Sequence, residues 1–149
     1  MTNSSISKIY IASDHRGVGL KLFLKDMLVS DGYDVDDLGS HNPEEMIDFP
    51  LVATWLADRM ACDPESRGIL ICGHGAGVQI AANRFRHLRA SRASNPTEAR
   101  MDRFHDDINV LALSANDIDT DVALLVSKEF LEAPFDAIPR RIKRLEMIS

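Results

Sequence analysis

The chain alternates short apolar runs with segments in which apolar residues recur every three or four positions. The runs Lys8–Ala12, Arg67–Cys72 and Asn109–Leu113 are typical of buried strands. Between such runs, segments such as Leu20–Leu28 and Asp119–Leu131 have the spacing of helices. Strands that alternate with helices form parallel sheets, because each return to a parallel strand needs a long crossover. The pattern therefore predicts an α/β fold with helices on both faces of one parallel sheet.

Weaker signals complete the expected elements. The expected strands are 8–12, 33–35, 67–72, 88–93 and 109–113. The expected helices are 20–28, 51–60, one opening at 78–83, one starting at 96, 119–131 and a short basic helix at 140–147. Asn95 and Pro96 are a typical cap and first position for a helix. A polar loop is expected at 39–50. Since no internal repeat or linker is evident, we expect one domain over residues 1–149.

Composition excludes several classes of protein. The 149 residues are 45% hydrophobic and 27% charged, as in an ordinary globular domain. A net charge of -6 argues against nucleic-acid binding. No apolar run approaches the roughly 20 residues of a membrane span, and the first residues do not resemble a secretory signal. Cys62 and Cys72 do not suggest a disulfide framework. We therefore expect a cytoplasmic protein that binds neither nucleic acid nor membranes.

The most informative segment is Cys72-Gly-His-Gly-Ala-Gly77, a glycine turn between a buried strand and a helix. Backbone N–H groups at a helix N-terminus attract anions and favour a thiolate, so Cys72 could act as a base or a nucleophile. Cys72 could equally be a small buried apolar residue. A dinucleotide-binding turn is disfavoured, because Val78 stands where the last glycine of that motif belongs.

Other polar residues are expected at the same edge of the sheet. Asp14 and His15 follow the first strand, while Ser94 and Ser114–Asn116 follow later strands. Ligands of such sheets bind outside the carboxyl ends of the strands. Asp14 and His15 suit proton transfer or hydroxyl binding. A capping Asp beside an exposed His explains them equally well.

Candidates also lie outside this edge. His105 and Asp106 end an expected helix, where a solvated helix end is the simpler interpretation. Arg140 and Arg144 share one helix face and form either an anion site or a solubilising tail. The conceivable metal ligands are Asp14, His15, His74, His105 and Asp106. Because they match no ligand spacing, we expect no metal.

Four motifs together resemble one family. They are Asp14-His15-x-Gly17-x-x-Leu20-Lys21; Asp48-Phe49-Pro50; Gly68-Ile-Leu-Ile-Cys72-Gly-x-Gly75-x-Gly77-x-x-Ile80-Ala-Ala-Asn83-Arg84; and His105-Asp-Asp-x-Asn109-Val-Leu111. Their order and spacing resemble the type B ribose-5-phosphate isomerase and galactose-6-phosphate isomerase family. The resemblance runs from about Ile9 to Arg144.

The resemblance implies a Rossmann-like three-layer α/β/α sandwich with a five-stranded parallel sheet. It implies a cofactor-free aldose–ketose isomerase of sugar phosphates, in the pentose phosphate pathway or a related one. Such enzymes are dimers or tetramers with the active site shared between subunits. This chain would then be a homodimer or homotetramer whose ligand is a small sugar phosphate.

The resemblance also implies residue roles. Cys72 would be the base that moves a proton between C1 and C2 through an enediolate. His105 of a neighbouring subunit would help to open the sugar ring, with Asp14 near the ring oxygen or hydroxyls. The residues implied in phosphate binding are His15, Arg140 and Arg144. Backbone amides of the turn, at Gly73, Gly75, Ala76 and Gly77, would hold the enediolate.

This sequence departs from the family at four positions. His74 replaces a Thr or Ser that helps ring opening, and could take over that role. Asp106 replaces an Asn, and its charge could repel an enediolate. Asn116 replaces an Arg that helps to bind phosphate, while Phe49 replaces a Tyr. The sequence also has extra basic residues at Arg16 and Arg92 that could compensate.

The expected function is isomerisation of ribose 5-phosphate and ribulose 5-phosphate, or of a related sugar phosphate such as a tetrulose phosphate. The alternatives are a non-catalytic sugar-phosphate-binding protein and a metal-dependent hydrolase that uses His74, His105 and Asp106.

Overall fold

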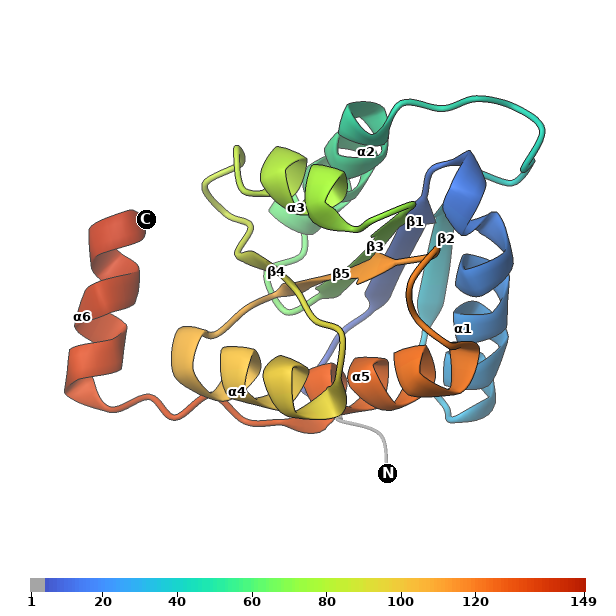
Figure 1. Cartoon of the computed structure of the whole chain (residues 1–149). Helices are drawn as coiled ribbons and strands as arrows, with labels where there is room; N and C mark the ends of the chain where they lie inside the picture. The colour runs from blue at the N-terminus through green and yellow to red at the C-terminus, as the bar shows by residue number, and fades with distance from the viewer. Residues whose placement is uncertain (1–4) are drawn as a thin grey trace.

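The computed structural model describes residues 5–149, which form a parallel sheet with helices on both faces (Figure 1). Its strands are β1 (Ile9–Ser13), β2 (Val35–Gly39), β3 (Arg67–Cys72), β4 (Ala90–Arg92) and β5 (Val110–Ser114). Its helices are η1 (His15–Gly17), α1 (Val18–Ser30), α2 (Phe49–Ala61), α3 (Ala76–Ala82), α4 (Pro96–Asp106), α5 (Thr120–Glu132) and α6 (Pro139–Ile148). The strands of this described range lie in the order β2-β1-β3-β5-β4, and each pair is parallel. The predicted three-layer α/β/α fold is confirmed.

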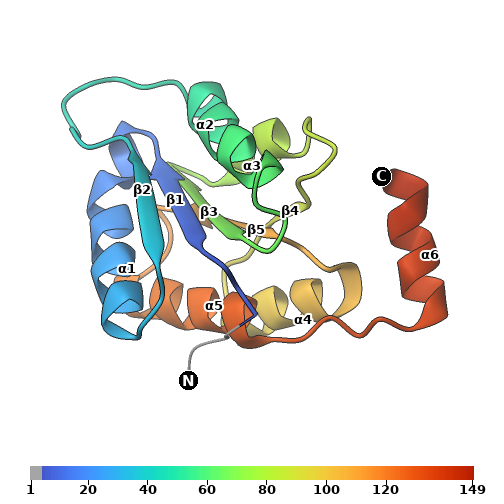
Figure 2. The same cartoon turned by 180° about the vertical axis from the view of Figure 1, so that it is seen from behind.

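Alternation along the strands divides the core between the two faces of the sheet. Ile69 and Ile71 of β3 belong to the cluster that includes residues of α1, α4 and α5. Leu70 and Cys72 belong to the opposite cluster, with residues of α2 and α3. Both views of the ribbon show these two helical layers (Figures 1 and 2). Cys72 thus ends its strand on the side that α2 and α3 cover.

The second strand lies later in the chain than predicted. Residues 33–35 were expected, but β2 spans Val35–Gly39, and Tyr33 packs in the core instead. Asp37 weakens the sequence signal for this strand, because acidic residues are rare in strands. The structure tolerates it there because Lys21, which is fully buried, lies 2.5 Å from its carboxylate. An ion pair that joins distant segments cannot be read from local patterning.

The boundaries of the loop predicted at 39–50 were also wrong. Gly39 belongs to β2, and α2 begins at Phe49 rather than at Leu51. Pro50 fits the first turn of a helix, where its missing N–H has no partner to lose.

Helix α6 stands apart from the layers (Figures 1 and 2). None of its residues is buried, and Ile142, Met147 and Ile148 expose apolar side chains. Its start is held to α4, where the Arg141 guanidinium lies 5.0 Å from the centroid of the Phe104 ring. Within residues 5–149, neither α6 nor any other helix is long and apolar enough to cross a membrane. The apolar side of α6 is therefore left uncovered by the described chain.

Candidate active site

The segments that follow β1, β3 and β5 meet at one edge of the sheet. The N–H of Asp14 donates to the carbonyl of Ile71 at 3.1 Å. From the other side, the N–H of Asn116 donates to the carbonyl of Gly73 at 3.0 Å. The structure thus brings together Asp14, the glycine turn and Asn116, as the predicted topology requires.

Cys72 lies at the base of the turn and is 5% exposed. Its Sγ accepts a hydrogen bond from the N–H of Gly75 at 3.2 Å. Gly75 has a φ of 78°, and a Cβ there would lie 3.0 Å from the carbonyl carbon of Leu113, so glycine is required. The turn therefore aims a backbone donor at the sulfur. That arrangement suits a side chain that carries negative charge during a reaction.

Side chains from three directions cover the glycines of the turn. A Cβ on Gly73 would lie 2.9 Å from Nη1 of Arg16 and 3.2 Å from Nδ2 of Asn116. A Cβ on Gly77 would lie 3.0 Å from the ring of Phe49. Because Gly73 and Gly77 have no side chains, a guanidinium, an amide and an aromatic ring can approach the backbone there. Arg16, which the sequence alone could not place, belongs to this edge.

His74 is the exposed residue at the tip of the turn, and a short chain of hydrogen bonds orients it. Its Nδ1 lies 3.3 Å from Oδ2 of Asp117, which also accepts the Ser114 hydroxyl at 2.7 Å. These contacts lower the pKa of Asp117, with the Ser114 hydroxyl as the larger cause and His74 as the next. The Nε of Arg92 donates to the carbonyl of His74 at 2.8 Å. Asp117 was not among the predicted site residues, although its spacing of three from Ser114 is that of a local side-chain pair.

Asp14 and His15 occupy the neighbouring strand end. Asp14 is buried, and its Oδ1 accepts the N–H groups of Arg16 at 2.9 Å and Gly17 at 3.2 Å. The capping role considered for Asp14 is therefore real. His15 is half-buried, and its Nδ1 accepts the N–H of Ile47 at 3.3 Å. In the neutral ring the proton then resides on Nε2, which can donate to a ligand.

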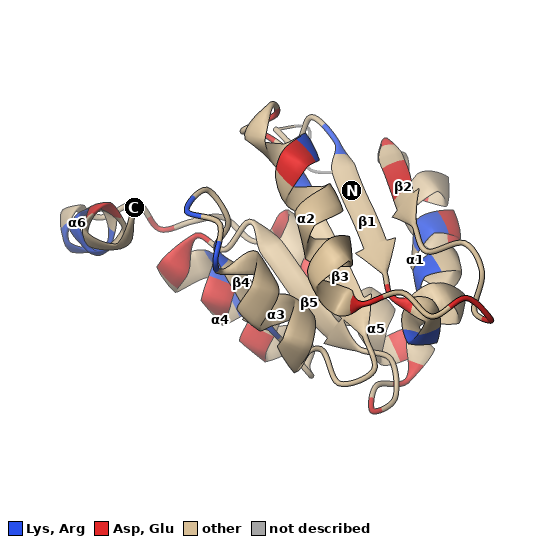
Figure 3. Ribbon diagram, turned by 90° about the horizontal axis from the view of Figure 1, so that it is seen from above, with Lys and Arg blue, Asp and Glu red and all other residues tan. Residues whose placement is uncertain are grey.

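The other predicted residues lie at the opposite edge of the sheet. His105 and Asp106 are exposed at the end of α4, just before β5 begins at Val110. Arg140 and Arg144 lie on α6, whose basic residues stand away from the sheet (Figure 3). Strands β3 and β5 separate these residues from the glycine turn. The predicted site is therefore divided into two groups within one chain.

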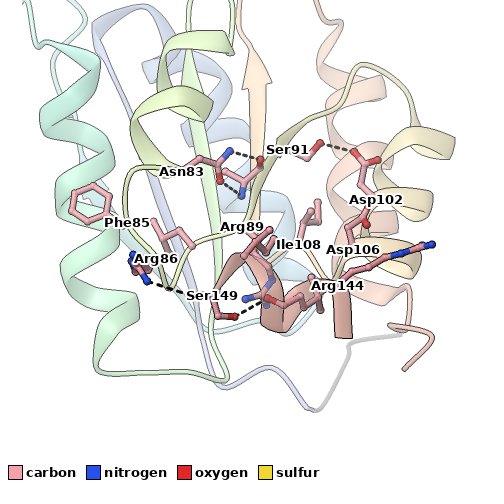
Figure 4. A pocket seen from close by; sticks show the side chains of 14 residues that line it. Asn83, Phe85, Arg86, Arg89, Ser91, Asp102, Asp106, Ile108, Arg144 and Ser149 are labelled. Carbon is pink, nitrogen blue, oxygen red and sulfur yellow. Dashed lines mark hydrogen bonds between the residues drawn. The ribbon is translucent and has the colours of Figure 1, made fainter. Parts of the chain in front are cut away.

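Two residues of the second group, Asp106 and Arg144, line a groove between α6 and the body of the chain (Figure 4). The groove has a volume of about 620 Å³, and Asp102, Asp106 and Arg144 are among its lining residues. Burial raises the pKa of Asp102, although the Ser91 hydroxyl donates to its carboxylate at 2.6 Å. Asp106 and Arg144 thus share a solvent-open surface that is remote from Cys72.

Within residues 5–149, no cluster of three or more His, Cys, Asp and Glu side chains could hold a metal ion.

Ala76 and Gly77 begin α3, where helical N–H groups lack partners within the helix. The first group therefore offers a thiol, backbone donors, imidazoles and a carboxylate. This set suits proton transfer on a small polar substrate.

Comparison with known proteins gives these features a context. The family model described as Ribose/Galactose Isomerase matches residues 9–148. The chain belongs to this family. The chain is 35% identical to the ribose-5-phosphate isomerase B of Escherichia coli, over 97% of this chain and 95% of that protein. It is 39% identical to the probable ribose-5-phosphate isomerase B of Mycoplasma pneumoniae, over 94% of this chain and 91% of the relative.

Solved structures share the fold of this isomerase family member. The ribose 5-phosphate isomerase of Thermotoga maritima has a TM-score of 0.90 and 38% identity, covering 95% of this chain and 96% of that one. The Mycoplasma genitalium ribose-5-phosphate isomerase B, solved with bound ribulose-5-phosphate, has a TM-score of 0.90 and 34% identity. That alignment covers 96% of this chain and 95% of the other.

Proposed function

We propose that the chain interconverts an aldose phosphate and its ketose, with ribose 5-phosphate and ribulose 5-phosphate as the first pair to test. The observation that carries this proposal is the Cys72 sulfur, which lies beneath a turn of backbone donors with a hydrogen bond from Gly75. The relatives named ribose-5-phosphate isomerase B, one of them solved with bound ribulose-5-phosphate, support the choice of sugar.

In this mechanism Cys72 removes the proton from C2 of the open-chain aldose and returns it to C1. The electron pair of the broken C–H bond forms the C1–C2 double bond and shifts the carbonyl electrons onto O1, which gives an enediolate. The proton of the C2 hydroxyl passes to O1, so that the carbonyl re-forms at C2 as C1 is protonated. Oxidation at C2 balances reduction at C1, so no cofactor is needed. The N–H groups of Ala76 and Gly77, at the start of α3, would hold the enediolate oxygen.

Ring opening precedes proton transfer, because the cyclic sugar has no free carbonyl. We assign this step to His74. It lies on the edge of the sheet that holds Cys72, Asp14 and the glycine turn, which we call the catalytic edge, and its Nδ1 lies 3.3 Å from Oδ2 of Asp117. An imidazole held by a carboxylate can donate and accept protons near neutral pH. His74 would thus replace the hydroxyl that the family usually has at this position.

A second copy of the chain would complete the site. His105, Asp106, Arg140 and Arg144 cannot serve the Cys72 of their own chain, because they lie at the other edge of the sheet. The uncovered apolar side of α6 gives a reason for association, since burying it against a second copy is favourable. In this homodimer, His105 of one chain would be the second proton-transfer group that ring opening requires, beside His74 of the other chain. Arg140 and Arg144 would join His15 of that other chain around the phosphate.

The test compares Cys72→Ala with Cys62→Ala, in buffer treated with a chelator. Cys62 is an exposed free thiol at the end of α2, so its loss controls for the general effect of removing a cysteine. We expect Cys72→Ala to slow conversion of ribose 5-phosphate by roughly 100- to 10,000-fold, as for loss of a catalytic base. Cys62→Ala should retain full activity.

Equal activity in both variants would refute Cys72 as the base. Binding of ribose 5-phosphate by wild-type protein without any conversion would instead support the non-catalytic binding protein.

A further inference from the structure

Two basic side chains lie against the glycine turn in the described structure. Arg92 donates to the carbonyl of His74 at 2.8 Å, whereas Arg16 lies over Gly73. Its Nη1 would lie 2.9 Å and its Cδ 3.0 Å from a Cβ on Gly73. Asn116 reaches the same point from the other side, at 3.2 Å. Since Gly73 follows Cys72 directly, the guanidinium lies over the residue next to the proposed base.

The guanidinium of Arg16 is exposed and, within residues 5–149, forms no ion pair or side-chain hydrogen bond. Five other arginines pair with carboxylates: Arg59, Arg89, Arg100, Arg103 and Arg141. The chain has 23 acidic residues against 17 basic ones, so carboxylates to pair with are plentiful. An arginine that stays unpaired at the catalytic edge is available for an anionic ligand.

Position 116 explains why an arginine is needed here. The sequence resemblance gives the usual residue at this position as an arginine that helps to bind phosphate, and this chain has Asn116. Its amide still reaches Gly73 but carries no charge. Arg16 and Asn116 cover the same glycine. The guanidinium of Arg16, in η1, can therefore occupy the place that an arginine side chain at position 116, after β5, would have filled.

We propose that Arg16 binds the phosphate group of the substrate from the catalytic edge, together with the Nε2–H of His15. This proposal rests on the proposed function for its substrate, but the anion site itself can be measured without turnover. Arg16 is then a specificity-determining residue that selects phosphorylated over unphosphorylated sugars. Its fork of N–H donors suits a phosphate, and it complements Arg140 and Arg144 of a second copy.

The experiment measures the dissociation constants of inorganic phosphate and ribose 5-phosphate by calorimetry, in a Cys72→Ala background where no conversion occurs. The variant is Arg16→Met, which keeps an aliphatic cover over Gly73 and removes the charge. The control is Arg59→Met, which removes the same charge from the far end of α2, where Arg59 pairs with Asp36 at 3.5 Å. Thermal unfolding of each variant verifies that it is folded.

We expect Arg16→Met to weaken binding of both probes by roughly 10-fold or more, as for one lost charge-assisted hydrogen bond. Arg59→Met should leave both constants unchanged. Adding Asn116→Arg to Arg16→Met should restore much of the loss, because the two positions reach one point. Binding of plain ribose should not respond to either change.

Unchanged phosphate binding in Arg16→Met, or an equal loss in Arg59→Met, would overturn the proposal. Failure of Asn116→Arg to restore any affinity would contradict the shared place over Gly73. Because these readouts need no catalysis, they stay distinct from a failure of the isomerase function, which would show as absent conversion by the wild-type chain.

Discussion

At the residue scale, the site combines a motif that is visible in the sequence with contacts that are not. Cys72 could be identified because an apolar strand leads directly into closely spaced glycines. The pairing of Asp117 with His74 could not be identified, because it joins residues 43 positions apart where the segments after β3 and β5 meet. Arg16 was noticed as an extra charge, but only the packing over Gly73 gives it a place.

The pairing of His74 with Asp117 predicts a defect that depends on whether the substrate is cyclic. Asp117→Asn removes the carboxylate that orients the imidazole, so conversion of cyclic ribose 5-phosphate should fall by roughly 10-fold or more. Exchange of the C1 proton of ribulose 5-phosphate, which has no furanose form, needs no ring opening and should change far less. Proton NMR measures both rates. An equal loss in both would contradict a ring-opening role for His74.

At the element scale, local signals located the helices better than the edge strand. The expected Asn95 cap of α4 is confirmed, since its Oδ1 accepts the N–H of Glu98 at 3.0 Å. Such a cap involves only residues that are close in the sequence, so it can be predicted from the sequence. Strand β2 instead depends on the buried pair between Lys21 and Asp37, which joins α1 to the sheet.

The start of α4 also predicts how stability varies with pH. Hydrogen bonds from the Ser94 N–H and hydroxyl, at 2.7 and 3.0 Å, lower the pKa of Glu98 below its ordinary 4.5. A lowered folded pKa stabilises the fold above the ordinary value, and this contribution disappears as pH falls through the folded value. Glu98→Gln should therefore lose less unfolding free energy than wild type between about pH 5 and pH 3.

Urea unfolding at several pH values measures this difference. Glu45→Gln is the matched control, because the Glu45 carboxylate is exposed and makes no hydrogen bond within residues 5–149. An identical pH dependence in Glu98→Gln and wild type would contradict a stabilising role for the hydrogen bonds from Ser94 to the Glu98 carboxylate.

At the scale of the whole molecule, the topology separates Cys72 from His105 within one chain. The resemblance implied such a separation, because it assigned His105 to a neighbouring subunit. The thiol and the glycine turn follow the carboxyl ends of the strands, whereas His105 ends a helix that returns to the amino ends. The order of elements requires this separation, because a helix between parallel strands runs back across the sheet. The uncovered side of α6 could not be predicted, since the sequence does not say where that helix lies.

The divided site predicts complementation between inactive chains. Mixing Cys72→Ala with His105→Ala should restore about a quarter of wild-type activity, because half of randomly formed dimers carry one intact site. Mixing Cys72→Ala with Asp14→Ala should restore none, since both residues lie on the same edge of one chain. Activity after unfolding and refolding the mixtures is the measurement. Equal recovery in the two mixtures would contradict a site shared between chains.

The most direct test of the account is proton NMR in D₂O with ribose 5-phosphate and chelator-treated protein. Proton transfer through an enediolate passes the C2 proton through a thiol that can exchange with solvent. We therefore predict conversion to ribulose 5-phosphate with deuterium at C1, and no conversion by Cys72→Ala. Conversion without any deuterium would indicate that the hydrogen moves between the carbons without exchanging with solvent. Undiminished conversion by Cys72→Ala, or the absence of conversion by the wild-type protein, would contradict Cys72 as the base of an isomerase.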